Sequence, residues 1–120
     1  MQEQRELLSK GGTMRLGAYP STIKKGTQLE RAYQKNHIAE RHRHRFEFNN
    51  AYRASFEEHG MCISGVSPDD ALVEAIEYSA NDFYIGVQYH PEFKSRPHRA
   101  HPLFIDFIKY AKQLNKRNCE

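Results

Sequence analysis

The stretch GVQYHPEFKSRP, residues 86–97, decides how the fold of this chain is interpreted. An almost entirely apolar run from Phe83 to Tyr89 leads directly into His90, Pro91 and Glu92. Such a run predicts a strand that is buried on both faces of a sheet. Catalytic and ligand-binding groups gather just past the ends of buried strands in α/β sheets. The stretch therefore predicts an α/β fold with a functional site at the end of this strand.

His90 and Glu92 are spaced so that they can act as a pair. Side chains two residues apart in a strand lie on the same side, with the two Cα atoms roughly 7 Å apart. Pro91 favours extended geometry at His90. Glu92 could then accept the proton of one imidazole nitrogen, which leaves the other nitrogen as a base for a nucleophile. Solvated polar residues are also common at strand ends, so the tripeptide alone leaves both interpretations open.

Composition narrows the class of protein. The chain has 120 residues, the size of one small domain, and its formal net charge of +3 does not by itself indicate nucleic acid. Cys62 and Cys119 are too few for a disulfide framework, which favours a reducing, cytoplasmic setting. The start MQEQRELLSK lacks the apolar segment of a secretory signal, and no apolar run approaches the ~18 residues of a membrane span. We therefore expect a cytoplasmic protein without a membrane partner.

Periodicity and turn residues predict the remaining elements. We expect strands at 14–20 (ended by Pro20), 61–66, 71–78 and 83–89, an extended segment at 38–48, and helices at 27–34, from Asn49 or Asn50 to Phe56, and from Pro102 onward. Thr27 and Glu30 are spaced as a capping box for the first helix. In the last helix, apolar residues recur at three- and four-residue steps, which predicts an amphipathic helix packed on the sheet. Its buried stripe should comprise Phe104, Phe107, Ile108 and Ala111.

Three motifs in this order resemble one family. GGTMRLG (residues 11–17), ERHRHRFEFN (40–49) and GVQYHPEFKSRP together resemble the C-terminal part of CTP synthase, within its class I glutamine amidotransferase domain. The resemblance extends to about Leu114. It implies a poorly defined start at 1–10, the C-terminal portion of an amidotransferase domain at 11–117 and a tail at 118–120. The fold it implies is the C-terminal half of a flavodoxin-like α/β domain, with several strands and a C-terminal helix.

The resemblance also implies an activity and site residues. The family makes CTP from UTP, ATP and glutamine, and its amidotransferase domain hydrolyses glutamine through a Cys-His-Glu triad and a thioester. By this resemblance His90 is the base, Glu92 is the carboxylate that orients it, and Arg45 contacts L-glutamine. A guanidinium suits that role because its planar fork can bind a carboxylate in two places. The complete family uses ATP and Mg²⁺ in a separate synthetase domain, takes GTP as activator and forms homotetramers, so we expect no cofactor on this chain.

The triad's nucleophile is absent from the sequence. The family carries its cysteine in a Gly-x-Cys-x-Gly-like turn before the GGTMRLG motif, and this chain has no such turn. Cys62 opens a predicted strand, and Cys119 lies in the polar tail, so neither has the setting that activates a thiol. We therefore expect no glutamine hydrolysis by this chain alone. Three hypotheses stay open: part of a CTP synthase, an inactive remnant or binding module, and one half of a split amidotransferase.

The RHRHR run at 41–45 could suggest nucleic-acid binding. Acidic residues flank the run and no aromatic stacking platform is in register with it, so we expect no nucleic-acid partner. The roles of Arg41, Arg43, Lys94 and Arg96 stay open, and the last two could dock against the rest of a complete enzyme.

Seven histidines raise the question of a metal site. His42 and His44 are spaced to share one face of a strand, and His98 and His101 flank the start of the last helix. No cysteine or carboxylate completes a regular zinc pattern with them, so we expect no metal.

Overall fold

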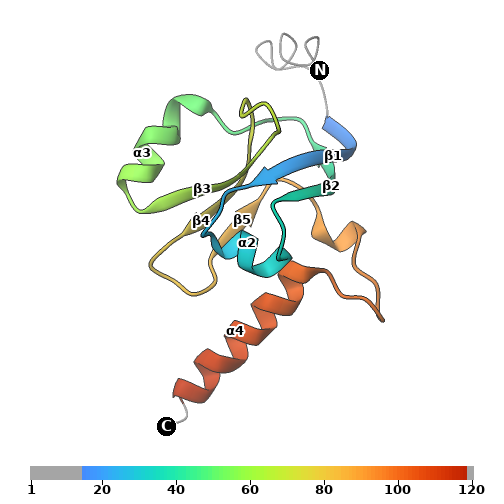
Figure 1. Ribbon diagram of the computed structural model, residues 1–120, viewed down its shortest axis with the longest axis vertical. Helices are drawn as coiled ribbons and strands as arrows, with labels where there is room; N and C mark the ends of the chain where they lie inside the picture. Colours follow the sequence, from blue (N-terminus) through green and yellow to red (C-terminus); the bar gives the residue numbers. More distant parts are fainter. Residues whose placement is uncertain (1–14, 119–120) are drawn as a thin grey trace.

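A computed structural model describes residues 15–118, which form one curled five-stranded sheet with helices around it (Figure 1). The strands are β1 (Arg15–Ile23), β2 (His37–His44), β3 (Met61–Val66), β4 (Val73–Tyr78) and β5 (Ile85–Val87). The helices are α2 (Gln28–Tyr33), α3 (Arg53–Glu58) and α4 (Pro102–Asn118), with 3-10 turns η1 (Asn50–Tyr52) and η2 (Pro91–Phe93). The fold is α/β, as predicted. The expected start at 1–10, the GGTM part of the first motif and Cys119 lie outside the described residues.

The sheet is antiparallel between all neighbouring strands that the structure describes, in the order β2-β1-β3-β4-β5. β1 pairs with β2 over eight residues, from Arg15↔His44 to Thr22↔His37. The prediction that Pro20 ends the first strand is wrong, because Pro20 pairs with Ala39 inside β1. β3 pairs with β1 only at Thr22 and Ile23, so Pro20 has a neighbouring strand on one side only, where proline is tolerated.

Helix α2 has the N-cap that its sequence predicts, while the Glu30 carboxylate accepts from the Gly26 amide and not from the Thr27 amide of a capping box. The Thr27 hydroxyl accepts a hydrogen bond from the Glu30 amide at 3.1 Å, which confirms Thr27 as the N-cap. From across the sheet, the Glu77 carboxylate accepts hydrogen bonds from the amides of Gln28 (2.8 Å) and Leu29 (3.2 Å). A carboxylate at a helix N-terminus satisfies amides that have no partner within the helix. Glu77 is therefore buried for a structural reason, although its charge would suggest exposure.

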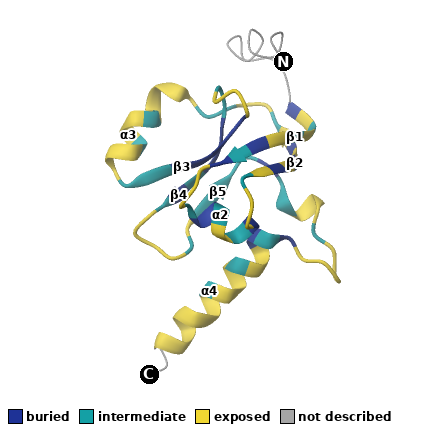
Figure 2. Ribbon diagram, viewed as in Figure 1, coloured by how far each residue is buried: buried dark blue, intermediate teal, exposed yellow. Residues whose placement is uncertain are grey.

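The main hydrophobic core lies between the sheet and helix α2. It comprises Ile23, Leu29, Tyr33, Ile38, Ala75, Tyr89 and Leu103, and a smaller cluster comprises Ile63, Val66 and Val73. Figure 2 shows the buried residues concentrated in the strands, while α3 and most of α4 are exposed. Within the described range, no helix is both long enough and apolar enough to cross a membrane.

Strand β5 is shorter and less buried than predicted. Only Ile85–Val87 pair with β4, and all three residues are half-buried. The prediction of a strand at 83–89 buried on both faces is therefore wrong. In the sheet that the structure describes, β5 is an edge strand, since it has β4 on one side only.

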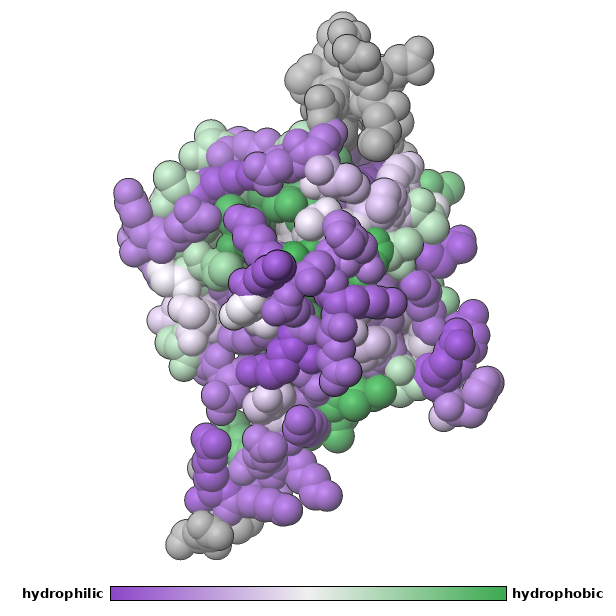
Figure 3. All heavy atoms as spheres, in the orientation of Figure 1, coloured by the Kyte–Doolittle hydropathy of each residue, from purple (hydrophilic) through white to green (hydrophobic). Residues whose placement is uncertain are grey.

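Helix α4 does not bury its apolar stripe. It contacts α2, and the Phe83 ring packs against Phe107 and Tyr110, but the helix then runs away from the sheet (Figure 1). Leu103 is buried, whereas Phe107 is 52% and Ile108 is 62% exposed. In Figure 3 a hydrophobic group lies beside the first turns of α4 on an otherwise mostly hydrophilic face. The prediction of a packed stripe is wrong for the described residues, because none of their other elements covers this face of the helix.

Replacing Leu29 should cost far more stability than replacing an exposed leucine. Leu29 is 1% exposed, so Leu29→Ala should lower the free energy of unfolding by about 2–4 kcal/mol through lost burial and a cavity. Leu16→Ala is the matched control, since Leu16 is 65% exposed and should change stability by less than about 0.5 kcal/mol. Urea unfolding measures both values. Equal losses at the two positions would contradict the core described here.

Candidate active site

His90 and Glu92 are in direct contact. His90 Nδ1 lies 2.6 Å from Glu92 Oε1. The backbone does not stay extended as predicted: it enters the 3-10 turn η2 at Pro91, and the amides of Phe93 and Lys94 donate to the carbonyls of His90 and Pro91. The pairing is therefore made by a turn rather than by strand alternation. Proline at the first position of that turn has a fixed φ. The His–Glu pair therefore has little conformational freedom.

The pair is held against the outer edge of β2. The His90 amide donates to the Arg41 carbonyl at 2.9 Å, and Lys94 Nζ donates to the Ala39 carbonyl at 2.7 Å. The His90 ring also stacks on Phe93, with 4.9 Å between ring centroids and 20° between planes. The backbone, the ring and the following side chain thus each fix the position of His90.

The electrostatics of the pair suit proton transfer. The hydrogen bond with His90 is the largest cause that holds the pKa of Glu92 below its usual value, so Glu92 is a carboxylate at neutral pH. With Nδ1 engaged by Glu92, His90 Nε2 has no hydrogen-bond partner among residues 15–118. The His90 side chain is 37% exposed, so another group can reach this nitrogen. A histidine oriented by a carboxylate on one nitrogen and free on the other is the arrangement of a general base.

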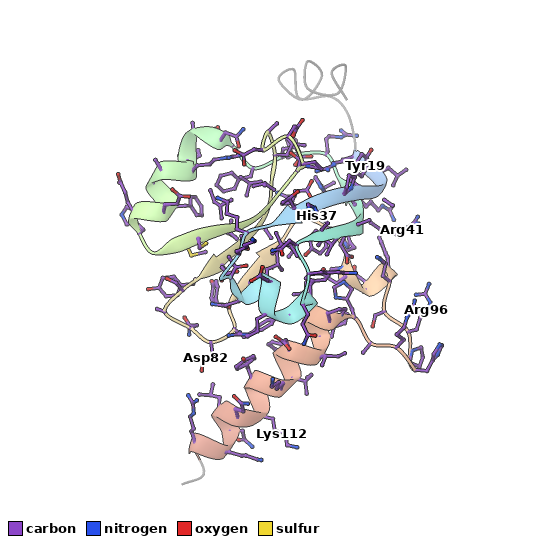
Figure 4. All side chains as sticks on the ribbon, in the orientation of Figure 1. Tyr19, His37, Arg41, Asp82, Arg96 and Lys112 are labelled. Carbon is purple, nitrogen blue, oxygen red and sulfur yellow. The ribbon has the colours of Figure 1, made fainter. Side chains whose placement is uncertain are left out.

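Arg45 lies at a bend directly after β2 and is exposed. Within the described part of the chain, its guanidinium makes no hydrogen bond or ion pair. Side chains alternate between the two faces along β2, so Arg41 and Arg43 are also exposed, while His42 points into the core. Figure 4 shows Arg41 directed away from the sheet. The assignment of Arg45 to glutamine stays a prediction.

A basic hollow of about 430 Å³ lies between β2 and the loop after η2. Its lining comprises Ala18, Ala39, Arg41, Phe93, Lys94, Arg96 and Arg99. Lys94 bonds to the Ala39 carbonyl, and Arg96 bonds to the carbonyls of Phe93 and Ser95 at 3.2 and 2.8 Å. These two cations therefore hold their own loop in place, and a role in docking stays a prediction.

Sequence reasoning missed a set of buried polar residues on the inner face of β2. Glu40 and His42 are 2% and 1% exposed, although the run in which they lie is dense in charge. The missed signal was the direction of the shared face: Ile38 is apolar, so the alternating positions Glu40 and His42 lie on the inward face with it. Tyr33, Tyr89 and His101 join Glu40 in one hydrogen-bonded group.

His42 belongs to a second buried group. Its Nδ1 lies 2.8 Å from His44 Nε2, and its Nε2 lies 3.7 Å from the Glu74 carboxylate, which Arg15 also contacts. Burial first, and then the charge of Arg15, lower the pKa of His42 to about 3. Residues 15–118 contain no group of three or more His, Cys, Asp or Glu side chains arranged to hold a metal ion.

Cys62 has neither the setting nor the place of a nucleophile. It is half-buried in β3, and burial raises the pKa of its thiol, opposite to the shift of a reactive cysteine. The pairing Ile23↔Gly65 places Cys62 beyond the C-terminal end of β1. The pairing Ala18↔Arg41 places Arg41, whose carbonyl accepts the His90 amide, near the other end of β1. At ~3.3 Å per residue, this separation is on the order of 20 Å.

Comparison with known proteins identifies the family. The model of the glutamine amidotransferase class-I family matches residues 2–110. CTP synthase of Aquifex aeolicus (strain VF5) is 53% identical over 117 residues, which cover 98% of this chain and 22% of that protein. CTP synthase of Methanosphaera stadtmanae is 57% identical over 112 residues, which cover 93% and 21%. This chain thus spans about a fifth of the length of these curated relatives.

A solved structure gives the same result for the fold. The glutaminase domain of Trypanosoma brucei CTPS, with bound acivicin, is 37% identical and superposes with a TM-score of 0.81 over 87% of this chain and 42% of that chain. The chain therefore belongs to the class I glutamine amidotransferase family. Within that family it matches the amidotransferase region of CTP synthases, as its motifs predicted.

Acid should destabilise the fold through His42. In the folded state the pKa of His42 is about 3, against an ordinary value of 6.5, so between these pH values the unfolded chain binds more protons. Stability should therefore fall as the pH drops below 6.5, by at most about 1.4 kcal/mol per pH unit from this group. His44, whose pKa burial also lowers, should act in the same direction.

The variant His42→Gln isolates this effect. Burial raises the pKa values of Glu47 and Glu74, which opposes the histidine effect above about pH 4.5, so the difference between wild type and variant is the relevant quantity. Urea unfolding between pH 7.5 and 4.5 should give a shallower acid decline in the variant. Parallel pH profiles would contradict a buried neutral His42.

Proposed function

We propose that this chain supplies the base and its orienting carboxylate to the glutaminase site of a CTP synthase, which makes CTP from UTP, ATP and glutamine. The observation that carries the proposal is the 2.6 Å contact between His90 Nδ1 and Glu92 with the opposite ring nitrogen open. The match to CTP synthases over most of the chain supports the substrate. The thiol would come from residues beyond these 120, in the same polypeptide or in a second one.

The chemistry follows from the open nitrogen. Nε2 of His90 accepts the proton of a cysteine thiol, and the thiolate attacks the carboxamide carbon of glutamine. The imidazolium, stabilised by Glu92, returns the proton to the leaving nitrogen, so ammonia departs and a thioester forms. His90 then takes a proton from water, which hydrolyses the thioester to glutamate and frees the thiol. One histidine thus serves both halves of the reaction.

Arg45 is proposed to bind the glutamine substrate. Its guanidinium is exposed beside the end of β2 and is not used by any described residue, so it is available for a ligand carboxylate. Two parallel N–H donors of a guanidinium match the two oxygens of a carboxylate. A lysine could neutralise the same charge but could not reproduce this geometry.

The remaining parts of the reaction are proposed to lie elsewhere. ATP and Mg²⁺ would act in the synthetase domain of the complete family. GTP would activate the complete enzyme, which would be a cytoplasmic homotetramer. The exposed apolar face of α4 supports the need for a further piece of protein, whether in the same chain or in a second one. An isolated chain would bind L-glutamine weakly or not at all.

A chimera tests the proposal directly. This chain would replace the matching 117-residue region of the Aquifex aeolicus CTP synthase, whose remaining residues would provide the thiol. The chimera should release ammonia from glutamine. His90→Ala should lower that rate by about 10³-fold or more, because the triad acts as a unit, and Glu92→Gln should lower it by about 10²-fold or more. His98→Ala, which changes an exposed histidine of the same loop, should leave the rate unchanged.

Measurements on the isolated chain give the results that would contradict the proposal. The 120-residue chain alone should show no ammonia release above background. Glutamine hydrolysis by this chain that survives His90→Ala but is lost in Cys62→Ala would overturn the assignment of the base. Tight glutamine binding by the isolated chain in calorimetry, without turnover, would instead favour a binding module.

A further inference from the structure

The buried group formed by Tyr33, Glu40, Tyr89 and His101 lies directly behind His90. We propose that Glu40, acting with Tyr33 and His101, is a positioning residue for His90: it fixes the two backbone segments between which the base is held. The inference rests on the proposed role of His90 as a base. The geometry of the group stands independently of that role.

Tyr33 and His101 meet at one oxygen of the Glu40 carboxylate, and Tyr89 joins the group through Tyr33. Glu40 Oε1 lies 3.0 Å from the Tyr33 hydroxyl and 2.9 Å from His101 Nε2. The Tyr33 hydroxyl also lies 3.1 Å from the Tyr89 hydroxyl and 3.2 Å from His101 Nε2. None of the four residues is more than 8% exposed. Hydrogen bonds in such a buried site are strong, and a lost partner leaves a buried polar group unsatisfied.

The proton positions follow from the contacts at each end. The Leu103 amide donates to His101 Nδ1 at 3.1 Å, so Nδ1 is an acceptor and the ring proton lies on Nε2. That proton is donated to Glu40. Tyr33 has a single hydroxyl proton, and the carboxylate is its stronger acceptor, which leaves Tyr89 to donate to Tyr33. Every donor therefore leads toward the Glu40 carboxylate.

The buried group joins the two backbone segments that hold His90. Tyr89 immediately precedes His90, and Glu40 immediately precedes Arg41, whose carbonyl accepts the His90 amide at 2.9 Å. The contact between Tyr89 and Glu40, through Tyr33, therefore clamps the same pair of segments that this backbone hydrogen bond joins. Tyr89 is buried on the inner side, while His90 on the outer side is partly exposed. The inward residues thus set the outward direction of the base.

His101 extends the clamp to the far end of the active-site loop. Its carbonyl accepts the amides of Phe104 and Ile105 at the start of α4, and its own amide donates to Ser95 Oγ at 3.1 Å. The loop from His90 to His101 is consequently tied to Glu40 at both ends.

Burial is the main cause that raises the pKa values of Tyr33 and Tyr89, so both hydroxyls keep their protons as donors at physiological pH.

Amide hydrogen exchange in the 120-residue chain tests the clamp. Tyr33→Phe removes one hydroxyl, and Glu40→Gln removes the charge at similar size. Each should speed exchange of the His90 amide by about tenfold, the size of one lost hydrogen bond. The Lys24 amide, which donates to the Ser64 carbonyl at 2.8 Å, is the reference for global unfolding and should change less. Tyr52→Phe is the matched control because Tyr52 is 57% exposed.

A second readout separates positioning from mere stability. In the chimera with Aquifex aeolicus CTP synthase, Tyr33→Phe should lower kcat for glutamine hydrolysis about tenfold with little change in KM, since the clamp holds the base and not the substrate. If Glu40→Gln does not fold, Tyr33→Phe decides alone. Folded variants with wild-type exchange at His90 and a wild-type kcat would overturn the inference. Faster exchange at His90 together with an inactive parent chimera would support the clamp and count against the proposed function.

Discussion

The open edge of β2 is the constraint on which the candidate site depends. An edge strand presents backbone groups that must find partners, and here the carbonyls of Ala39 and Arg41 would otherwise lack one. Lys94 Nζ and the His90 amide supply the two donors. The segment that carries the His–Glu pair is therefore also the segment that covers the edge. The same two hydrogen bonds therefore both satisfy the edge of β2 and place the His–Glu pair.

The alternation of side chains along β2 separates the RHRHR run into an outward and an inward set of residues. Arginines point outward, where their charge remains solvated or meets a ligand, and histidines point inward, where burial keeps His42 neutral. A buried histidine needs polar partners, which explains why His44 and Glu74 lie beside His42 and why Arg15 contacts Glu74. A run that resembles a simple basic patch is thus two interleaved sets, one for the surface and one for the interior.

The sequence predicted what depends on local chemistry and missed what depends on neighbours. The Thr27 cap and the pairing of His90 with Glu92 follow from spacing alone, although the pair forms through a turn and not a strand. Pattern could not show that Pro20 sits where only one strand neighbours β1, nor that the face of α4 is left uncovered. Charge was misleading at Glu40 and Glu77, because each carboxylate is buried with donors that come from distant parts of the chain.

The described contacts that directly fix the His–Glu pair come from β2, Glu92 and Phe93, and none of them involves α4. The turn at Pro91, the edge of β2 and the stacked Phe93 each restrict the His90 ring before any substrate arrives. Restriction in advance is valuable for a base, because its orientation then costs no further entropy during the reaction. Both side chains of the pair are accessible, Glu92 to 54% and His90 to 37%, so another group can reach them without a change in the fold. The fold by itself thus fixes the orientation of the His–Glu pair, and the proposed role of His90 as a base requires in addition only a nucleophile placed at the open ring nitrogen.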